Sequence, residues 1–170
     1  MTRAVLSIGS NIGDRLARLQ SVVAGLGDAV VAASPVYETA PWGGVEQGRF
    51  LNAVVIAEDP AAGVRAWLKA GQALEAVAGR VRATRWGPRT LDVDVVACHD
   101  GGDEIVLSEP DFVLPHPMAH KRAFVLVPWL EVEPQAQLTV AGVRRPVVQL
   151  LAELEPAERQ GVTPTDLELV

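Results

Sequence analysis

The sequence predicts an α+β fold: a ferredoxin-like βαββαβ core whose antiparallel-rich sheet is flanked by helices, with extra strands and helices at the C-terminal end. Apolar runs and helical periodicities follow one another in the order strand, helix, strand, strand, helix, strand. The composition agrees, because 49% of the 170 residues are hydrophobic and 21% are charged, as in a packed globule. We expect residues 1–155 to form a single domain and residues 156–170 to form a frayed tail.

The first half of the core begins with an apolar run, Arg3–Ile8, which ends at a Gly-Ser-Asn sequence and predicts a buried strand followed by a turn. A helix follows, because Asp14 can cap it and apolar residues then recur at three-and-four spacing until a glycine. Ala29–Tyr37 predicts the second strand, and Phe50–Glu58 predicts the third.

The second half of the core begins where Asp59 and Pro60 offer a cap and a first-turn proline for a second helix. The apolar stripe of this helix runs from Val64 to Ala78, and a glycine then ends it. Thr90–Cys98 predicts the fourth strand.

Two loops and several smaller elements complete the chain. Thr39–Gly48 is a turn-rich segment around one tryptophan, which favours a functional loop over a plain connector. Gly79–Arg89 is a second loop, rich in arginine. We expect a short strand over Glu104–Leu107 and helices near Phe124–Glu131 and Pro146–Leu154.

The charge balance restricts the possible partners. Fifteen Lys and Arg against 21 Asp and Glu give a formal net charge of -6. This is the wrong sign for a protein that coats nucleic acid or an anionic membrane. RNA binding on the sheet face is disfavoured further, because the chain has no aromatic RNP pattern. We expect no nucleic-acid or membrane partner, so any phosphate must be bound by a local basic cluster.

The cysteine count and the N-terminal sequence predict the compartment. Cys98 is the single cysteine, so it cannot form an internal disulfide, which favours a reducing environment. The apolar run at the N-terminus is too short for a signal peptide, and no window approaches the length of a membrane span. We expect a cytoplasmic protein.

Arginines cluster in the second loop. Arg80, Arg82, Arg85 and Arg89 make a local positive segment in an acidic protein. Guanidinium forks can bind several phosphate oxygens at once. On the arginines alone, a solvated loop that pairs with helix carboxylates remains an equal alternative.

Two aspartates follow this loop. Asp92 and Asp94 lie two residues apart in a strand, so their carboxylates stand side by side while Leu91, Val93 and Val95 enter the core. Adjacent carboxylates repel each other unless a cation or proton relieves them. Mg²⁺ takes hard oxygen ligands and shares them with substrate phosphates, so we favour a metal-nucleotide site over an exposed polar face of an edge strand. P-loop, dinucleotide-binding and protein-kinase motifs are all missing.

Several ordered motifs carry a resemblance to a known family. The motifs are Arg85–Asp94 (RWGPRTLDVD), Leu114–Pro117 (LPHP), Arg122–Leu126 (RAFVL), Gly9–Asn11 (GSN) and Tyr37–Asn52. As far as about Leu150, the chain closely resembles the 6-hydroxymethyl-7,8-dihydropterin pyrophosphokinases of folate biosynthesis. The resemblance implies that residues 1–155 form a single catalytic domain, an ATP-dependent 2-amino-4-hydroxy-6-hydroxymethyldihydropteridine diphosphokinase, which we expect to be a monomer.

The resemblance also implies a reaction and its residues. A pyrophosphoryl group would pass from ATP to the pterin hydroxymethyl oxygen and release AMP, with two Mg²⁺ ions bound by Asp92 and Asp94. The catalytic residues that it implies are Arg80, Arg89, Asp92 and Asp94. The ATP-binding residues that it implies are Gln72, Glu75, Arg82, Trp86, Arg89, His116 and Arg122. The pterin-binding residues that it implies are Thr39, Ala40, Trp42, Phe50, Asn52, Trp86, Asp92 and Phe124.

Part of the pterin site can also be argued from the strand pattern. Phe50 and Asn52 share one strand face, which sets a flat apolar ring beside an amide. An Asn side chain donates and accepts hydrogen bonds, as the edge of a pterin does, and Phe124 could stack on the opposite ring face. For both phenylalanines, plain core packing is the alternative.

Other functions and sites remain as weaker hypotheses. A non-catalytic module of the same fold could bind a nucleotide or pterin as a regulator, but it would not need paired aspartates beside an arginine-rich loop. A zinc pair at His116 and His120 is disfavoured, because Pro117 lies between them. The Gly-Ser-Asn sequence could bind an anion, but we favour a structural turn and cap.

Overall fold

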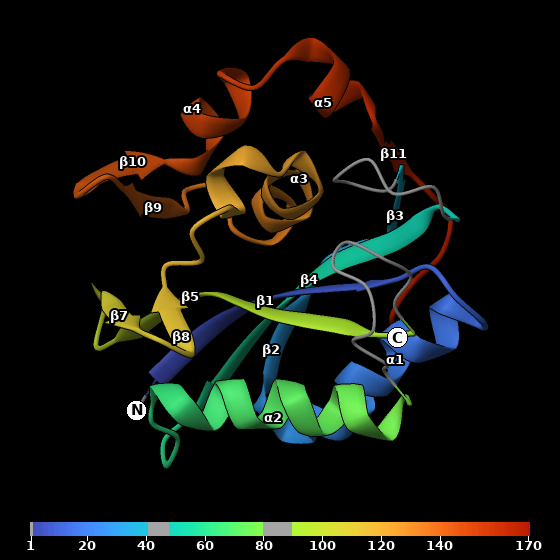
Figure 1. Ribbon diagram of the computed structural model, residues 1–170, viewed down its shortest axis with the longest axis horizontal. Coiled ribbons are helices and arrows are strands. Elements are labelled where there is room, and N and C mark those ends of the chain that lie inside the picture. The colour runs from blue at the N-terminus through green and yellow to red at the C-terminus, as the bar shows by residue number, and fades with distance from the viewer. Residues whose placement is uncertain (1, 41–47, 80–89) are drawn as a thin grey trace.

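The computed structural model describes residues 2–40, 48–79 and 90–170 (Figure 1). Its strands are β1 (Thr2–Ser10), β2 (Val30–Ala33), β3 (Tyr37–Thr39), β4 (Phe50–Asp59), β5 (Asp92–Asp100), β6 (Asp103–Glu104), β7 (Leu107–Glu109), β8 (Phe112–Leu114), β9 (Gln137–Val140), β10 (Val143–Pro146) and β11 (Val162–Pro164). Its α-helices are α1 (Arg15–Leu26), α2 (Val64–Val77), α3 (Ala123–Val132), α4 (Val147–Ala152) and α5 (Pro156–Gln160). None of these helices is both long enough and apolar enough to cross a membrane.

The central sheet has the strand order β11-β3-β4-β1-β5-β6, and β2 also pairs with β4. The pairings in this sheet are antiparallel. The part formed by β2 and β3, then β4, β1 and β5, has the order of a ferredoxin-like split βαβ pair. The fold class predicted from the sequence is therefore confirmed.

Helices cover both faces of this sheet. On one face α1 and α2 pack over a buried cluster, here called the α1-side cluster, that includes Leu6, Leu19 and Trp67 (Figure 1). On the opposite face α3 packs over a second buried cluster, the α3-side cluster, that includes Ile56 and Trp129. Because successive side chains of a strand point to opposite faces, β1, β4 and β5 supply residues to both clusters.

The second strand differs from its prediction. The sequence predicts one strand over Ala29–Tyr37, whereas the structure has two, β2 and β3, separated by residues 34–36. Pro35 has no N–H group to donate to a neighbouring strand. Ser34 joins the break to β4, because its N–H donates to Val54 O at 2.8 Å and its hydroxyl accepts the Val54 N–H at 2.9 Å. Both short strands therefore still pair with β4.

The starts of the first two helices give one correct and one wrong prediction. Asp14 caps α1 as predicted, since its carboxylate accepts the Ala17 N–H at 3.1 Å. The prediction that Asp59 caps α2 is wrong. Asp59 ends β4, and its carboxylate accepts the Ala61 N–H at 2.8 Å within a turn. The helix begins only after this turn, with Gly63 at its N-cap position.

The elements after β5 were predicted in part. The structure has α3 and α4 where helices near Phe124–Glu131 and Pro146–Leu154 were predicted. The single short strand predicted over Glu104–Leu107 is replaced by β6 and β7. The hairpin of β9 and β10 was not predicted. Each of its strands has four residues, and only β9 alternates between polar and apolar side chains.

Residues 156–170, which the sequence predicts to fray, lie against the fold instead. They form α5 and then β11, which pairs with β3. Thr165 Oγ1 donates to Val36 O at 2.7 Å. Leu169 is 4% exposed and Leu167 is partly buried, and both pack with the α1-side cluster. Burial of these two leucines gives the segment apolar contacts that a frayed chain end would lack.

Leu169→Ala should lower the free energy of unfolding by about 2 kcal/mol, because it removes buried apolar atoms and leaves a cavity. Thermal unfolding should show a drop in Tm of roughly 4–8 °C. Val170→Ala is the matched control, since Val170 is 89% exposed and should give an unchanged Tm. Equal Tm values for the two variants would mean that this C-terminal packing contributes nothing to stability.

Candidate functional site

Several of the described candidate residues gather where β1 ends between β4 and β5. Gly9 on β1 lies opposite Asn52 on β4 and opposite Asp92 on β5. Val93 packs into the α1-side cluster. By strand alternation, Asp92 and Asp94 therefore point to the other face, toward α3. The two carboxylates thus lie on the sheet face that also carries Asn52.

Arg122 brings a buried positive charge to these carboxylates. It directly precedes α3, is 7% exposed, and places Nη1 3.8 Å from Asp94 Oδ2. Burial lowers the pKa of Arg122, and the carboxylates of Asp94, Asp92 and Glu158 oppose that shift. Its guanidinium also lies over the Phe124 ring, 5.6 Å from the ring centre. A guanidinium beside carboxylates can hold anion oxygens that a metal ion brings to the same place.

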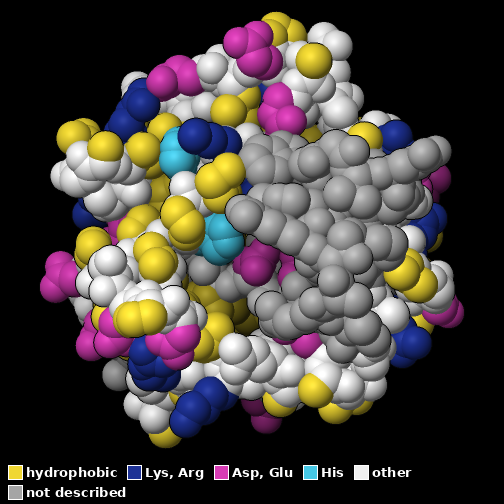
Figure 2. Space-filling view, in the orientation of Figure 1, with side chains coloured by type: hydrophobic (Ala, Val, Ile, Leu, Met, Phe, Trp, Pro, Cys, Tyr) yellow, Lys and Arg dark blue, Asp and Glu magenta, His cyan; other side chains and the backbone are white. Residues whose placement is uncertain are grey.

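His116 adds a neutral donor beside the same carboxylates. Its backbone N–H donates to Val96 O at 2.8 Å, which joins its loop to β5. Its Nδ1 accepts the Met118 N–H at 3.2 Å, so in the neutral ring the proton is on Nε2. Burial and, less strongly, Arg122 lower the pKa of His116 to about 4 against the opposing effect of Asp92. In Figure 2 a histidine lies against acidic side chains near the centre of the face.

Asn52 is held in one orientation on the other side of Gly9. Its Nδ2 donates to Thr39 Oγ1 at 2.6 Å, and both residues are buried. A Cβ on Gly9 would lie 2.8 Å from Asn52 Oδ1 and 3.4 Å from Phe50 Cδ1. The absence of a side chain at this glycine therefore leaves room for the amide oxygen and the ring edge between the two neighbouring strands.

The two phenylalanines are half-buried. Phe124 packs at the border of the α3-side cluster, so it combines core packing with its contact to Arg122. Among the described residues, Phe50 is in neither buried cluster, and its contact with a pterin stays a prediction. Gly9 and Ser10 are the last two residues of β1. The strand therefore extends into the Gly-Ser-Asn sequence, where we predicted a turn.

Glu75 and Gln72 lie on α2 in different surroundings. Glu75 is 4% exposed, and its Oε2 accepts the Val93 N–H at 2.9 Å, between the positions of Asp92 and Asp94. Gln72 is exposed. Glu75 therefore fixes the edge of the strand that carries both carboxylates, and helical spacing alone gave no sign of that contact. The ATP contacts of both residues stay predictions.

Ala40 is exposed and directly follows β3. Several other candidate residues lie outside the described ranges. The candidates outside the described ranges are Trp42, Arg80, Arg82, Trp86 and Arg89.

The donor set suits Mg²⁺. Across residues 2–40, 48–79 and 90–170, no three His, Cys, Asp or Glu side chains are grouped as a complete metal site. Mg²⁺ is commonly held by one or two carboxylates, with water and substrate phosphates as its other ligands. Asp92 and Asp94, side by side at the start of β5, offer that arrangement, and Arg122 Nη1 lies 3.8 Å from Asp94 Oδ2.

Comparison with known proteins decides the family. A family model described as 7,8-dihydro-6-hydroxymethylpterin-pyrophosphokinase (HPPK) matches residues 5–134. This chain belongs to the HPPK family. A Mycobacterium tuberculosis (strain H37Rv) protein named 2-amino-4-hydroxy-6-hydroxymethyldihydropteridine pyrophosphokinase is 62% identical over 167 residues, 95% of this chain and 89% of the relative. The Mycobacterium leprae protein of the same name is 62% identical over 175 residues, 99% of this chain and 92% of the relative.

Solved structures share the fold of this HPPK chain. A crystal structure of Plasmodium falciparum HPPK-DHPS wild type with SDX-DHP has a TM-score of 0.61 at 14% identity, covering 90% of this chain and 43% of that one. A triple mutant of the same protein with STZ-DHP has a TM-score of 0.64 at 12% identity, covering 89% and 43%. At these identities the likeness concerns the fold alone.

One residue at the site of this HPPK chain was missed by sequence reasoning. Glu158 on α5 accepts the Ala123 N–H through Oε1 at 3.1 Å, at the start of α3 and beside Arg122. A carboxylate at a helix N-terminus is favourable, because the unpaired N–H groups there carry partial positive charge. Nothing in the sequence indicated this contact, because residues 156–170 were predicted to form a frayed tail.

In the metal-free protein, His116 should titrate with a pKa of about 4, below the ordinary histidine value of 6.5. Because the pKa is lower in the folded state, His116 stabilises the fold fully above the ordinary value and loses that contribution as the pH falls toward 4. NMR of the ring nitrogens would measure the midpoint. Arg122→Gln should raise it by removing a positive neighbour. A wild-type midpoint at or above the ordinary value would contradict the burial and charges described here.

Proposed function

We propose that this chain transfers a pyrophosphoryl group from ATP to the hydroxymethyl oxygen of 6-hydroxymethyl-7,8-dihydropterin, giving the pterin diphosphate and AMP in folate biosynthesis. One observation carries the proposal. Gly9 alone separates an oriented amide, Asn52, from the carboxylate pair Asp92 and Asp94 with its buried guanidinium Arg122. A pterin bound at Asn52 and ATP phosphates bound at Asp92 and Asp94 could therefore lie on the two sides of Gly9.

The amide side of the site is proposed to bind the pterin. Thr39 orients the Asn52 amide, which can then donate to and accept from the neighbouring polar groups of a pterin edge. Phe50 offers an apolar ring on the same strand face, and Phe124 offers another on α3. The resemblance adds Ala40, Trp42 and Trp86 to this set.

The carboxylate side is proposed to bind ATP. Asp92 and Asp94 would hold two Mg²⁺ ions, which supply positive charge to neutralise the phosphates as the reaction proceeds. Arg122 and the neutral His116 would contact phosphate oxygens through N–H donors. The resemblance adds these further residues: Gln72, Glu75, Arg80, Arg82, Trp86 and Arg89.

The proposed step is an in-line displacement at the β-phosphorus. The hydroxymethyl oxygen forms a bond to this phosphorus, the bond from the phosphorus to the oxygen bridging to the α-phosphate breaks, and AMP leaves with that oxygen. Asp92 is our candidate to accept the hydroxyl proton. Most of the rate gain would come from positioning and from the fixed charges of Asp94, Arg122 and the metal site.

We also propose that the chain works as a cytoplasmic monomer, with residues 1–155 and the packed segment 156–170 acting as one catalytic unit. The single cysteine, Cys98, supports a reducing compartment, because the chain cannot form an internal disulfide.

The test is AMP formation on mixing the purified chain with ATP, Mg²⁺ and 6-hydroxymethyl-7,8-dihydropterin. We expect pterin-dependent AMP, and Asp94→Asn should reduce kcat by about 10²–10³-fold, because a neutral amide holds a metal ion weakly. Asp103→Asn is the matched control, since Asp103 is exposed and lies at the far end of the sheet. ADP as product would indicate a single-phosphoryl kinase. Binding of both substrates without turnover would favour the alternative function, a non-catalytic module that binds a nucleotide or pterin as a regulator.

Gly9→Ala should raise KM for the pterin by about tenfold, because the new methyl group must displace a buried amide that is fixed by Thr39. KM for ATP should change much less. Steady-state kinetics with each substrate varied would measure both values. Gly63→Ala is the control, since a Cβ there meets no atom within 4 Å. A Gly9→Ala enzyme with wild-type pterin KM would remove Asn52 from the proposed pterin contacts.

A further inference from the structure

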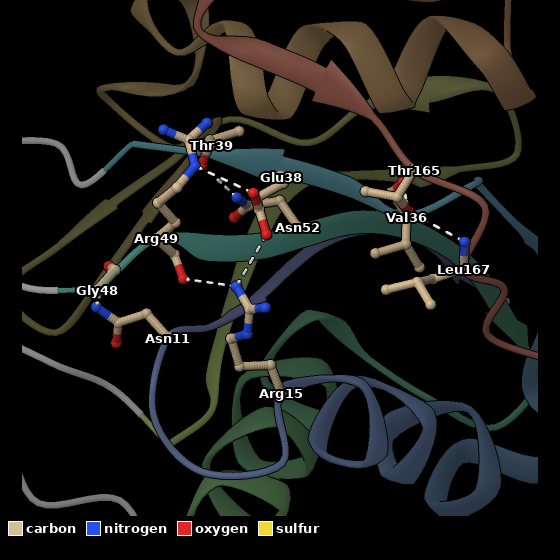
Figure 3. A network of polar contacts seen from close by, with 10 residues as sticks. All are labelled: Asn11, Arg15, Val36, Glu38, Thr39, Gly48, Arg49, Asn52, Thr165 and Leu167. Atoms are coloured by element: carbon tan, nitrogen blue, oxygen red, sulfur yellow. Dashed lines mark hydrogen bonds and ion pairs between the residues drawn. The ribbon is translucent and has the colours of Figure 1, made fainter.

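Glu38 is the centre of a network of polar side chains beneath the proposed pterin end of the site (Figure 3). Its Oε2 accepts from Arg15 Nη1 at 3.1 Å, and its Oε1 accepts from Arg49 Nε at 3.1 Å. Arg15 is the first residue of α1, and Arg49 directly precedes β4. One carboxylate therefore joins the start of a helix to the ends of two neighbouring strands.

Two further contacts hold the backbone where the chain enters β4. Arg15 Nη1 donates to Arg49 O at 3.1 Å, and Asn11 Nδ2 donates to Gly48 O at 3.0 Å. Asn11 directly follows β1. We call Asn11, Arg15, Glu38 and Arg49 the Glu38 network. It links the end of β1, the start of α1 and the end of β3 to the first residues before β4.

The residues of the proposed pterin site alternate with this network along the same strand ends. Thr39 follows Glu38 and lies opposite Phe50, which follows Arg49. Thr39 Oγ1 in turn accepts a hydrogen bond from Asn52 Nδ2 at 2.6 Å. In a strand, adjacent side chains point to opposite faces. The Glu38 side chain, with its network, therefore lies on one face of the sheet, and the side chains of Thr39 and Phe50 lie on the other. A shift of Glu38 relative to Arg49 must therefore change the spacing of the site residues.

We propose that Glu38 is a positioning residue for pterin binding: by holding Arg15 and Arg49 it fixes the spacing of the β3 and β4 ends that carry Thr39 and Phe50. The inference rests on the proposed function. It differs from a simple stability role, because the Glu38 and Arg49 side chains are 33% and 48% exposed and such pairs add little to global stability. Loss of the network should thus act locally, on pterin affinity.

The test uses Glu38→Gln, which keeps the size of the side chain and removes its charge. We expect KM for the pterin and its Kd in the presence of a non-hydrolysable ATP analogue to rise by about fivefold. KM for ATP should stay within about twofold and Tm within about 2 °C, because the phosphate half and the core are untouched. Glu38→Asp keeps the charge and should recover part of the pterin affinity.

Glu109→Gln is the matched control. Glu109 forms an ion pair of similar exposure with Arg65, on β7 and away from the site. This variant should bind the pterin like wild type. Wild-type pterin KM and Kd in Glu38→Gln would overturn the proposal. So would a parallel rise of both KM values with a Tm loss above about 4 °C, since that pattern marks a structural role alone.

The two proposals can fail separately. If wild type binds the pterin but forms no AMP, the proposed reaction is wrong, and the Kd ratio of Glu38→Gln to wild type still decides the positioning role. If wild type forms AMP and Glu38→Gln is unchanged, the positioning role is wrong and the reaction stands. If wild type binds no pterin, both are wrong.

Discussion

The pairing of β1 between β4 and β5 is the constraint on which the candidate site depends. Antiparallel pairing on both edges sets Gly9 opposite Asn52 on one side and opposite Asp92 on the other. Neighbouring strands lie about 4.8 Å apart, so the amide and the carboxylate are held about two strand spacings apart with no flexible linker between them. Because Gly9 carries no side chain, the Asn52 amide oxygen and the edge of the Phe50 ring can lie beside the β1 backbone. A rigid sheet thereby aligns the two proposed half-sites, as catalysis by positioning requires.

The buried charge of Arg122 dominates the electrostatics of the proposed phosphate half of the site. A guanidinium removed from water costs several kcal/mol unless carboxylates and hydrogen bonds compensate. Asp94 at 3.8 Å and the Coulombic attraction of Asp92 and Glu158 supply such compensation. Burial and, less strongly, this positive charge lower the pKa of His116 to about 4, so the ring is neutral and keeps a donor N–H at neutral pH. In the proposed site, these fixed charges would hold donors in place for phosphate oxygens before a substrate binds.

The sequence predicts what depends on local period and order. The strand and helix order yielded the sheet, and a spacing of two residues placed Asp92 and Asp94 on one face. Contacts between distant segments could not be read in this way. Glu158 reaches the start of α3 from the C-terminal segment, and Glu75 reaches the edge of β5 from a helix. Periodicity shows which face is apolar, but it does not show which partner covers a strand edge or a helix end. The broken second strand adds a case in which Pro35 interrupted an apolar run.

The proposed pterin half of the site includes the shortest of the strands that carry candidate residues. β3 has three residues, whereas β5, which carries the carboxylates, has nine. So short a strand makes few backbone hydrogen bonds and depends on its neighbours for its position. Those neighbours are β4 on one edge and β11 on the other, with Tyr37 tied to Glu131 of α3 through a 2.7 Å hydrogen bond. The Glu38 network adds side-chain contacts near the end of β3, from Glu38 to Arg15 and Arg49. Pterin affinity in the proposed site would therefore depend on contacts outside it. The longer β5, by contrast, is positioned by its extended pairing with β1 and by Glu75 at its edge.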